Sequence, residues 1–223
     1  MNIKQNLNNI LSQLPSQVTL VAVSKTKPVS DLMEAYNAGQ RDFGENKIQE
    51  MVEKYEHMPK DIKWHMIGHV QRNKVKYMAE FVSLIHGVDS LKLLKEINKQ
   101  AKKHDRIIKC LLQIKIAEED SKFGMSSEDA KQLIVSKEFS ELKNVYITGV
   151  MGMATFTDDS NQIEQEFKRL KTTFDNLKAM QTENCKLQTI SMGMSGDYQL
   201  AIACGSTMIR VGSSIFGSRN YSN

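Results

Sequence analysis

The chain has 223 residues, 40% of them hydrophobic and 25% charged, so it can bury a sizeable core, and we expect one domain over residues 1–223. The formal net charge is only +4, and no basic block is interleaved with aromatic residues, which argues against nucleic-acid binding. No apolar run approaches the length of a membrane span, so we expect no membrane association.

Three cysteines, Cys110, Cys185 and Cys204, lack CxxC spacing and lie in or beside apolar segments. This arrangement favours reduced thiols over a disulfide framework or a metal site, so we expect a cytoplasmic protein. Apolar residues recur at helical spacing between positions 3 and 14. The pattern predicts an amphipathic N-terminal helix and not a signal segment.

The first strand is predicted over Val18 to Lys25, VTLVAVSK, a short β-branched run typical of a strand buried on both faces. Lys25 closes this run, and in α/β folds ligands bind at the carboxyl ends of the strands. Partial burial and the neighbouring Lys27 both disfavour the ammonium form, which makes Lys25 a candidate for Schiff-base chemistry. The alternative is a lysine that simply ends the strand and extends into solvent.

Seven further strand-like segments follow, and helical patterns separate them. The strands are expected at 41–46, 64–68, 81–88, 107–117, 145–154, 187–192 and 208–211. Helices are expected from Ser30 as N-cap to Gly39, over 48–55, from His69, from Leu91, after the fifth and sixth strands, and over 198–203. Because parallel strands need long crossovers, this alternation predicts a parallel sheet, and eight strands can close a (β/α)8 TIM barrel with an extra N-terminal helix. No GxGxxG turn follows the first strand, which disfavours an open doubly wound sheet.

Two loops rich in small residues follow the last two strands. They read SMGMSGD over 191–197 and RVGSSIFG over 210–217. In TIM barrels the corresponding loops commonly bind phosphate, and Ser195 or Ser213 can add a hydroxyl donor. Arg210 lies within the last strand, where alternation can point it into the barrel beside Lys25. Each loop alone can be an ordinary connection, and Arg210 can be the partner of a carboxylate. Together with Lys25, however, the two loops and Arg210 suit the binding of pyridoxal phosphate (PLP).

Seven motifs resemble those of the pyridoxal phosphate homeostasis proteins, which are single-domain relatives of the alanine racemase N-terminal barrel. The motifs are VAVSKTKP (21–28), GQRDFGEN (39–46), WHMIGHVQRNK (64–74), SKFGM (121–125), GVMGMAT (149–155), SMGMSGD (191–197) and MIRVGSSIFG (208–217). They are spread over nearly the whole chain, and several of them together are highly specific.

The resemblance implies a set of cofactor-binding residues and no catalytic or metal-binding residue. It implies a covalent aldimine, or Schiff base, between PLP and Lys25, a cofactor contact from Asn46, phosphate contacts from Ser195, Gly212 and Ser213, and Arg210 facing the pyridine nitrogen. Many relatives carry threonine where this chain has Ser213, which keeps the hydroxyl. Lys47 stands where relatives commonly have an aromatic residue, which puts any stacking role of that residue in doubt.

An arginine at the pyridine nitrogen would keep that nitrogen unprotonated and make the ring a weaker electron sink. In alanine racemase a second base, a tyrosine, comes from a separate C-terminal domain, whereas this chain ends eleven residues after Gly212. Tyr198 and Tyr221, the tyrosines nearest the phosphate loops, are expected to pack or to lie at the surface. We therefore expect a monomeric protein that buffers PLP or delivers it to PLP-dependent apoenzymes, without robust turnover.

Two alternatives stay open at this stage. One is a PLP-dependent, racemase-like enzyme whose second base comes from a partner subunit, and the other is an aldolase-type barrel that binds a phosphorylated sugar. The pair His65 and His69 has metal-ligand spacing, but Gly68 interrupts it, so we expect no metal and a buried His65. Lys122 is expected at the ligand end of the barrel, where it is either solvated or able to contact ligand or accept cofactor from Lys25.

Overall fold

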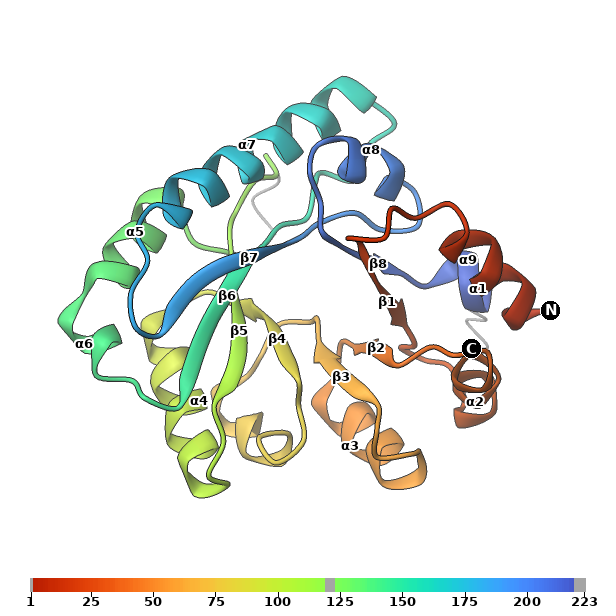
Figure 1. Cartoon of the computed structure of the whole chain (residues 1–223), viewed down its shortest axis with the longest axis horizontal. Helices are drawn as coiled ribbons and strands as arrows, with labels where there is room; N and C mark the ends of the chain where they lie inside the picture. Colours follow the sequence, from red (N-terminus) through yellow and green to blue (C-terminus); the bar gives the residue numbers. More distant parts are fainter. Residues whose placement is uncertain (1, 119–122, 219–223) are drawn as a thin grey trace.

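The structure, a computed structural model, describes residues 2–118 and 123–218. Within these residues eight parallel strands pair in chain order, and β8 pairs back to β1 to close a barrel (Figure 1). The predicted TIM barrel is therefore confirmed. Its strands are β1 Thr19–Val23, β2 Asp42–Glu45, β3 Lys63–Met66, β4 Leu84–Val88, β5 Ile108–Gln113, β6 Val145–Met151, β7 Cys185–Ser191 and β8 Met208–Val211.

Helices connect the strands and cover the outside of the barrel (Figure 1). They are α1 Ile3–Leu11, α2 Val29–Asn37, α3 Ile48–His57, the 3₁₀ helix η1 Arg72–Tyr77, α4 Leu91–Lys103, α5 Ser127–Val135, α6 Lys137–Ser140, α7 Ser160–Lys178, α8 Tyr198–Ala203 and α9 Ser213–Phe216. The extra N-terminal helix is confirmed as α1, which buries Ile3, Leu7 and Ile10. Helix α1 also contacts α9, because the Asn6 side chain donates to the Ile215 carbonyl at 3.1 Å.

Side-chain alternation separates the barrel interior from the layer beneath the helices. In β1, Leu20 and Ala22 join the apolar layer between strands and helices, whereas Val21 belongs to a small cluster inside the barrel. The other buried members of this interior cluster are Leu84, Leu111, Met151 and Met208. Arg210 stands beside Val21 in the β1–β8 register, so its side chain enters the barrel as predicted from the sequence.

The start of α2 differs from the prediction that Ser30 caps this helix. The helix begins at Val29, and Pro28 occupies the N-cap position with extended backbone. The Pro28 carbonyl accepts the first helical hydrogen bonds, from Asp31 and Leu32. Proline suits the start of a helix because its missing N–H would have no helical partner there.

Two other boundaries move because of contacts with the loop that follows β5. The helix expected from His69 is replaced by η1, which begins at Arg72, while the His69 ring stacks on Phe123 with centroids 4.1 Å apart. Strand β5 ends at Gln113 and not at position 117, because the chain bridges to Met125, whose N–H donates to the Gln113 carbonyl at 2.9 Å. These are non-local contacts that the local pattern does not encode.

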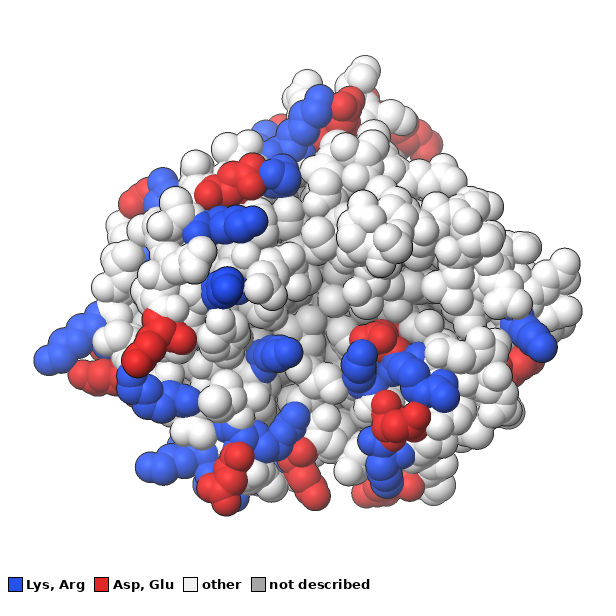
Figure 2. All heavy atoms as spheres, in the orientation of Figure 1, with Lys and Arg blue, Asp and Glu red and all other residues white. Residues whose placement is uncertain are grey.

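The surface carries no extended field of one sign on the face drawn in Figure 2, where basic and acidic side chains are intermixed. In the described part of the chain, no helix is both long and apolar enough to cross a membrane.

Candidate functional site

Lys25 lies two residues beyond the end of β1 and is half-buried. The register pairs Ala22 of β1 with Val211 of β8, so the residues that follow these two strands emerge side by side at the carboxyl end of the barrel. The contact is close, since a Cβ added to Gly212 would lie 3.0 Å from the Val23 carbonyl oxygen. The structure therefore brings Lys25 to the same end of the barrel as the loop after β8.

A buried lysine supports the turn that carries Lys25. Lys54 of α3 is only 5% exposed, and its ammonium donates to the Ser24 carbonyl, to Glu45 Oε1 and to Glu50 Oε1, each at 2.7 Å. On the other side of Lys25, the Thr26 N–H donates to the same Glu50 oxygen at 2.6 Å, and Thr26 has a φ of +64°. These bonds fix the backbone on both sides of Lys25.

Glu45, the last residue of β2, is fully buried within this cluster. Burial raises its pKa to about 7 from an ordinary 4.5, although Lys54 and the Ser24 hydroxyl, which lies 2.6 Å from Oε1, act in the opposite direction. The other carboxyl oxygen, Oε2, is buried without a hydrogen-bond partner among the described residues. Glu45 thus titrates near neutral pH directly beneath the turn that carries Lys25.

Asn46 follows Glu45 and is half-buried at the end of β2. The neighbouring strand end packs tightly against it, since a Cβ on Gly68 would fall 2.4 Å from the Asn46 carbonyl oxygen. Any larger residue at position 68 would displace this corner. The next residue, Lys47, is exposed and has extended backbone just before α3, and as a lysine it provides no aromatic ring for stacking.

The loops after β7 and β8 meet through Ser195. Its hydroxyl accepts from the Gly212 N–H at 3.2 Å, which joins the two predicted phosphate loops directly. Gly193 makes the first loop possible, because it has a φ of +96° and a Cβ there would lie 2.6 Å from the Ala201 Cβ of α8. Ser213 is exposed at the first position of α9, where backbone N–H groups have no acceptor within the helix.

Arg210 is 4% exposed inside the barrel. Its guanidinium donates to Ser191 Oγ at 2.6 Å and to the Gly152 carbonyl at 3.1 Å, and it forms no salt bridge with any described residue. Burial lowers the pKa of Arg210 to about 10, with Asp197 acting in the opposite direction, so the side chain stays cationic at neutral pH. The guanidinium therefore retains N–H groups for a ligand above the barrel interior.

The remaining candidates occupy different places. The Lys27 ammonium donates to the carbonyls of Phe216 and Ser218 at the end of α9, at 2.8 and 3.2 Å. Tyr198 is half-buried at the start of α8, whereas Lys122 and Tyr221 lie outside the described residues.

Sequence reasoning missed the polar residues that surround this site. Glu45 and Lys54 were not singled out, although a carboxylate at the end of a buried strand and the i, i+4 pair of Glu50 and Lys54 were visible signals. His86 and Ser191 were also missed, because inward-facing polar residues on buried strands show no motif of their own. The expected buried position of His65 matches the structure, where it is 3% exposed.

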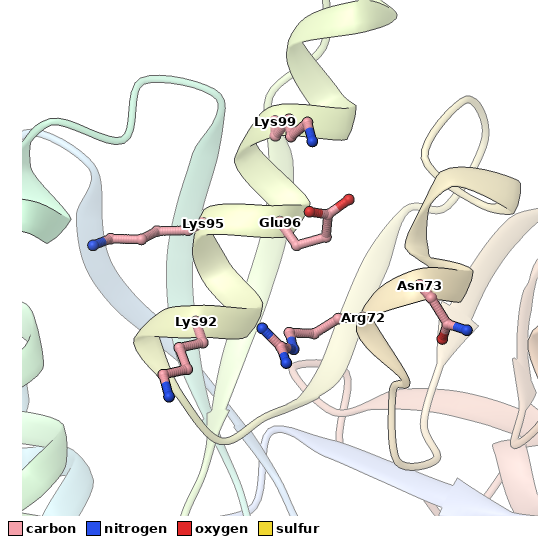
Figure 3. A pocket seen from close by; sticks show the side chains of 6 residues that line it. All are labelled: Arg72, Asn73, Lys92, Lys95, Glu96 and Lys99. Atoms are coloured by element: carbon pink, nitrogen blue, oxygen red, sulfur yellow. The ribbon is translucent and has the colours of Figure 1, made fainter.

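A separate hollow of about 390 Å³ lies on the outside of the barrel between η1 and α4 (Figure 3). Its lining consists of Arg72, Asn73, Lys92, Lys95, Glu96 and Lys99. Arg72 points toward α4, whereas Lys95 on α4 extends away from Arg72. The basic groups therefore diverge and do not surround one point. No predicted site residue lines this hollow, and the candidate site stays at the carboxyl end of the barrel.

Comparison with known proteins gives one consistent family. The family model described as the alanine racemase N-terminal domain matches residues 1–220. A relative from Pasteurella multocida (strain Pm70) named pyridoxal phosphate homeostasis protein is 39% identical over 226 residues, covering 99% of this chain and 96% of its own. The Escherichia coli (strain K12) protein of the same name is 37% identical over 212 residues, covering 93% and 88%.

Solved structures agree with these relatives. PipY from Synechococcus elongatus, solved with PLP bound, is 36% identical and superposes with a TM-score of 0.87, covering 96% of this chain and 100% of its own. Its form without PLP gives a TM-score of 0.90. Alanine racemase from Clostridium difficile 630, at 17% identity and a TM-score of 0.79, shares the fold over 57% of its length. The chain belongs to the alanine racemase N-terminal domain family and, within it, to the pyridoxal phosphate homeostasis proteins.

Proposed function

We propose that this protein binds PLP at the carboxyl end of the barrel, as a Schiff base on Lys25, and serves intracellular PLP homeostasis by buffering or delivering the cofactor. The observation that carries this proposal is the meeting of three elements: Lys25 after β1, the Ser195–Gly212 contact between the last two loops, and the cationic Arg210 inside the barrel. The relative PipY, solved with PLP bound, supports the same ligand.

The residues present fit the chemistry of PLP. Ser195, Gly212 and Ser213 would hold the phosphate, because small residues allow close approach and the first N–H groups of α9 have no acceptor within the helix. Asn46 would contact the ring from the β2 side. Arg210 would face the pyridine nitrogen, since it enters the barrel next to β1 and has no carboxylate partner among the described residues.

The same geometry supports binding without robust turnover. When bound, PLP supplies an aldehyde that condenses with amines and a ring that withdraws electrons. Arg210 keeps its charge at neutral pH, and a second positive charge on the adjacent ring nitrogen would be unfavourable at interior dielectric. Without that proton the ring withdraws electrons less strongly, so carbanion chemistry is disfavoured.

The test is the visible absorption of purified protein titrated with PLP. The wild type should become yellow with saturable binding, and Lys25→Ala should abolish the visible band. Lys27→Ala is the matched control, because its ammonium contacts the carbonyls at the end of α9, and this variant should keep the band. A full band in Lys25→Ala would place the covalent bond on another lysine, and no band in the wild type would favour the aldolase-type alternative.

A further inference from the structure

Arg210 presents an electrostatic problem inside the barrel. A buried cation normally pairs with a carboxylate, because removing its hydration costs several kcal/mol if no counter-charge is present. Among the described residues its guanidinium instead donates to a hydroxyl, Ser191 Oγ at 2.6 Å, and to a carbonyl, that of Gly152. The Asp197 carboxylate favours the charge of Arg210, but the two partners that hold the guanidinium directly are neutral.

A continuous line of hydrogen bonds leads from Ser191 to a carboxylate. His86 Nδ1 lies 3.0 Å from Ser191 Oγ, His86 Nε2 lies 3.0 Å from His65 Nδ1, and His65 Nε2 lies 3.1 Å from Asp42 Oδ1. These four residues, on β7, β4, β3 and β2, together with Arg210 on β8, are named here the interior relay. Asp42 is the first residue of β2, so the relay crosses the barrel from its amino end to the residue that faces the proposed ligand.

The carboxylate end of the interior relay fixes the direction of its bonds when both imidazoles are neutral. Asp42 can only accept, so His65 donates to it from Nε2 and accepts at Nδ1 from His86 Nε2, and His86 Nδ1 in turn accepts from the Ser191 hydroxyl. Arginine can only donate, so Ser191 Oγ also accepts from Arg210. Burial, with the Arg210 charge adding to it, holds the pKa of His86 well below its ordinary value, which agrees with a neutral ring.

We propose that Asp42, His65, His86 and Ser191 are positioning residues for Arg210 and hold its guanidinium in one orientation. This inference rests on the proposed function, because it concerns the arginine that would face the pyridine nitrogen. The relay makes Arg210 a persistent cation at that nitrogen. Without the relay, the guanidinium loses one of its fixed partners and is free to turn away from the ligand.

The first test uses the protein without PLP and needs no assumption about its ligand. Long-range ¹⁵N–¹H NMR of the five histidines, assigned through His65→Gln and His86→Gln, reports which ring nitrogen carries the proton. In both His65 and His86 the proton should lie on Nε2, with Nδ1 unprotonated. A proton on Nδ1 of His86, or a charged His86 at neutral pH, would overturn the relay.

The second test measures what the relay does to the bound ligand. Ser191→Ala should weaken PLP binding by roughly ten-fold or more, because it removes a hydrogen bond to a charged group. It should also shift the ¹⁵N resonance of pyridine-labelled PLP toward the protonated position, and Ser191→Thr, which keeps the hydroxyl, should restore both values. Ser206→Ala is the matched control, since Ser206 is also buried but, among the described residues, its hydroxyl bonds only backbone carbonyls, including that of Met192 at 2.8 Å.

Asp42→Asn separates charge from hydrogen bonding and guards against misfolding, because Asp42 lies at the barrel end with a 20% exposed side chain. The Asn amide can offer His65 either an oxygen or an NH2 group, so it no longer fixes the proton positions of the relay. The pyridine resonance should therefore shift in the same direction as in Ser191→Ala while the fold is kept. Equal ¹⁵N shifts in Ser191→Ala, Asp42→Asn and Ser206→Ala would overturn the inference. A wild type that binds no PLP would instead refute the proposed function, and the histidine tautomers would still decide the relay.

Discussion

Glu45 should make the stability of this protein fall as the pH rises toward 8. Its pKa in the folded state is raised to about 7 from an ordinary 4.5, so between these values the folded state binds more protons than the unfolded state. A raised carboxyl pKa contributes stability that is fully present below pH 4.5 and is lost as the pH rises through 7. A shift of this size corresponds to about 3 kcal/mol of unfolding free energy.

The perturbation that isolates this effect is Glu45→Gln, which keeps the shape of the side chain and removes its titration. The stability of the variant relative to the wild type should rise by about 3 kcal/mol between pH 4.5 and pH 8. In a chain of this size each kcal/mol corresponds to roughly 2–4 °C in melting temperature. Urea unfolding followed by the fluorescence of Trp64, the only tryptophan and fully buried, measures the difference at each pH.

The control is Glu50→Gln, which also removes a carboxylate from Lys54 but leaves Glu45 in place. This variant should keep most of the pH dependence of the wild type. If the stability curves of Glu45→Gln and the wild type run parallel from pH 4.5 to pH 8, Glu45 does not titrate near neutrality and the reasoning fails.

Three further outcomes are expected. Ser195→Ala combined with Ser213→Ala should weaken PLP binding by about 1.5–3 kcal/mol for each hydroxyl that contacts phosphate, while the barrel stays folded despite the loss of the Ser195–Gly212 bond; equal affinity in a titration would place the phosphate elsewhere. Gly193→Ala should lower the unfolding free energy by about 2–4 kcal/mol through its positive φ and its clash with α8, whereas Gly196→Ala, with open space around it, should be near neutral in the same denaturant assay. PLP-loaded protein incubated with L-alanine in deuterated water should form no D-alanine at an enzymatic rate, and D-alanine formation lost in Lys25→Ala would instead support the racemase-like alternative.

The barrel could be predicted from the sequence because its signals are local. Most strands are short apolar runs, helices separate them, and recognisable residues such as Lys25 and Gly212 follow the first and last strands. The placement of Arg210 inside the barrel followed from alternation alone and agrees with its register beside Val21. The predicted element boundaries were wrong where contacts with a distant segment determine them, as at His69, whose ring stacks on Phe123.

The polar residues beneath the site could not be predicted because their meaning depends on partners far away in the sequence. His86 and Ser191 are 105 residues apart, and each alone reads as an ordinary buried polar residue. Lys54 likewise reads as one half of a helical ion pair with Glu50, whereas its contact with the Ser24 carbonyl exists only once α3 packs against β1. Periodicity identifies which face a residue occupies but not which residue meets it across the barrel.

The interior relay is compatible with a stable core only because its hydrogen-bond donors and acceptors match. A half-satisfied polar network inside a barrel costs more than an apolar filling, since each unmatched group keeps its desolvation penalty. Here the anionic end at Asp42 leaves one consistent set of proton positions on two neutral imidazoles and the Ser191 hydroxyl, which also accepts from Arg210. Rotating Arg210 away would leave its guanidinium without the Ser191 partner and the Ser191 oxygen without this donor, both inside the barrel. The strands of the barrel therefore hold the orientation of Arg210, and the loops after β7 and β8 need only hold the phosphate.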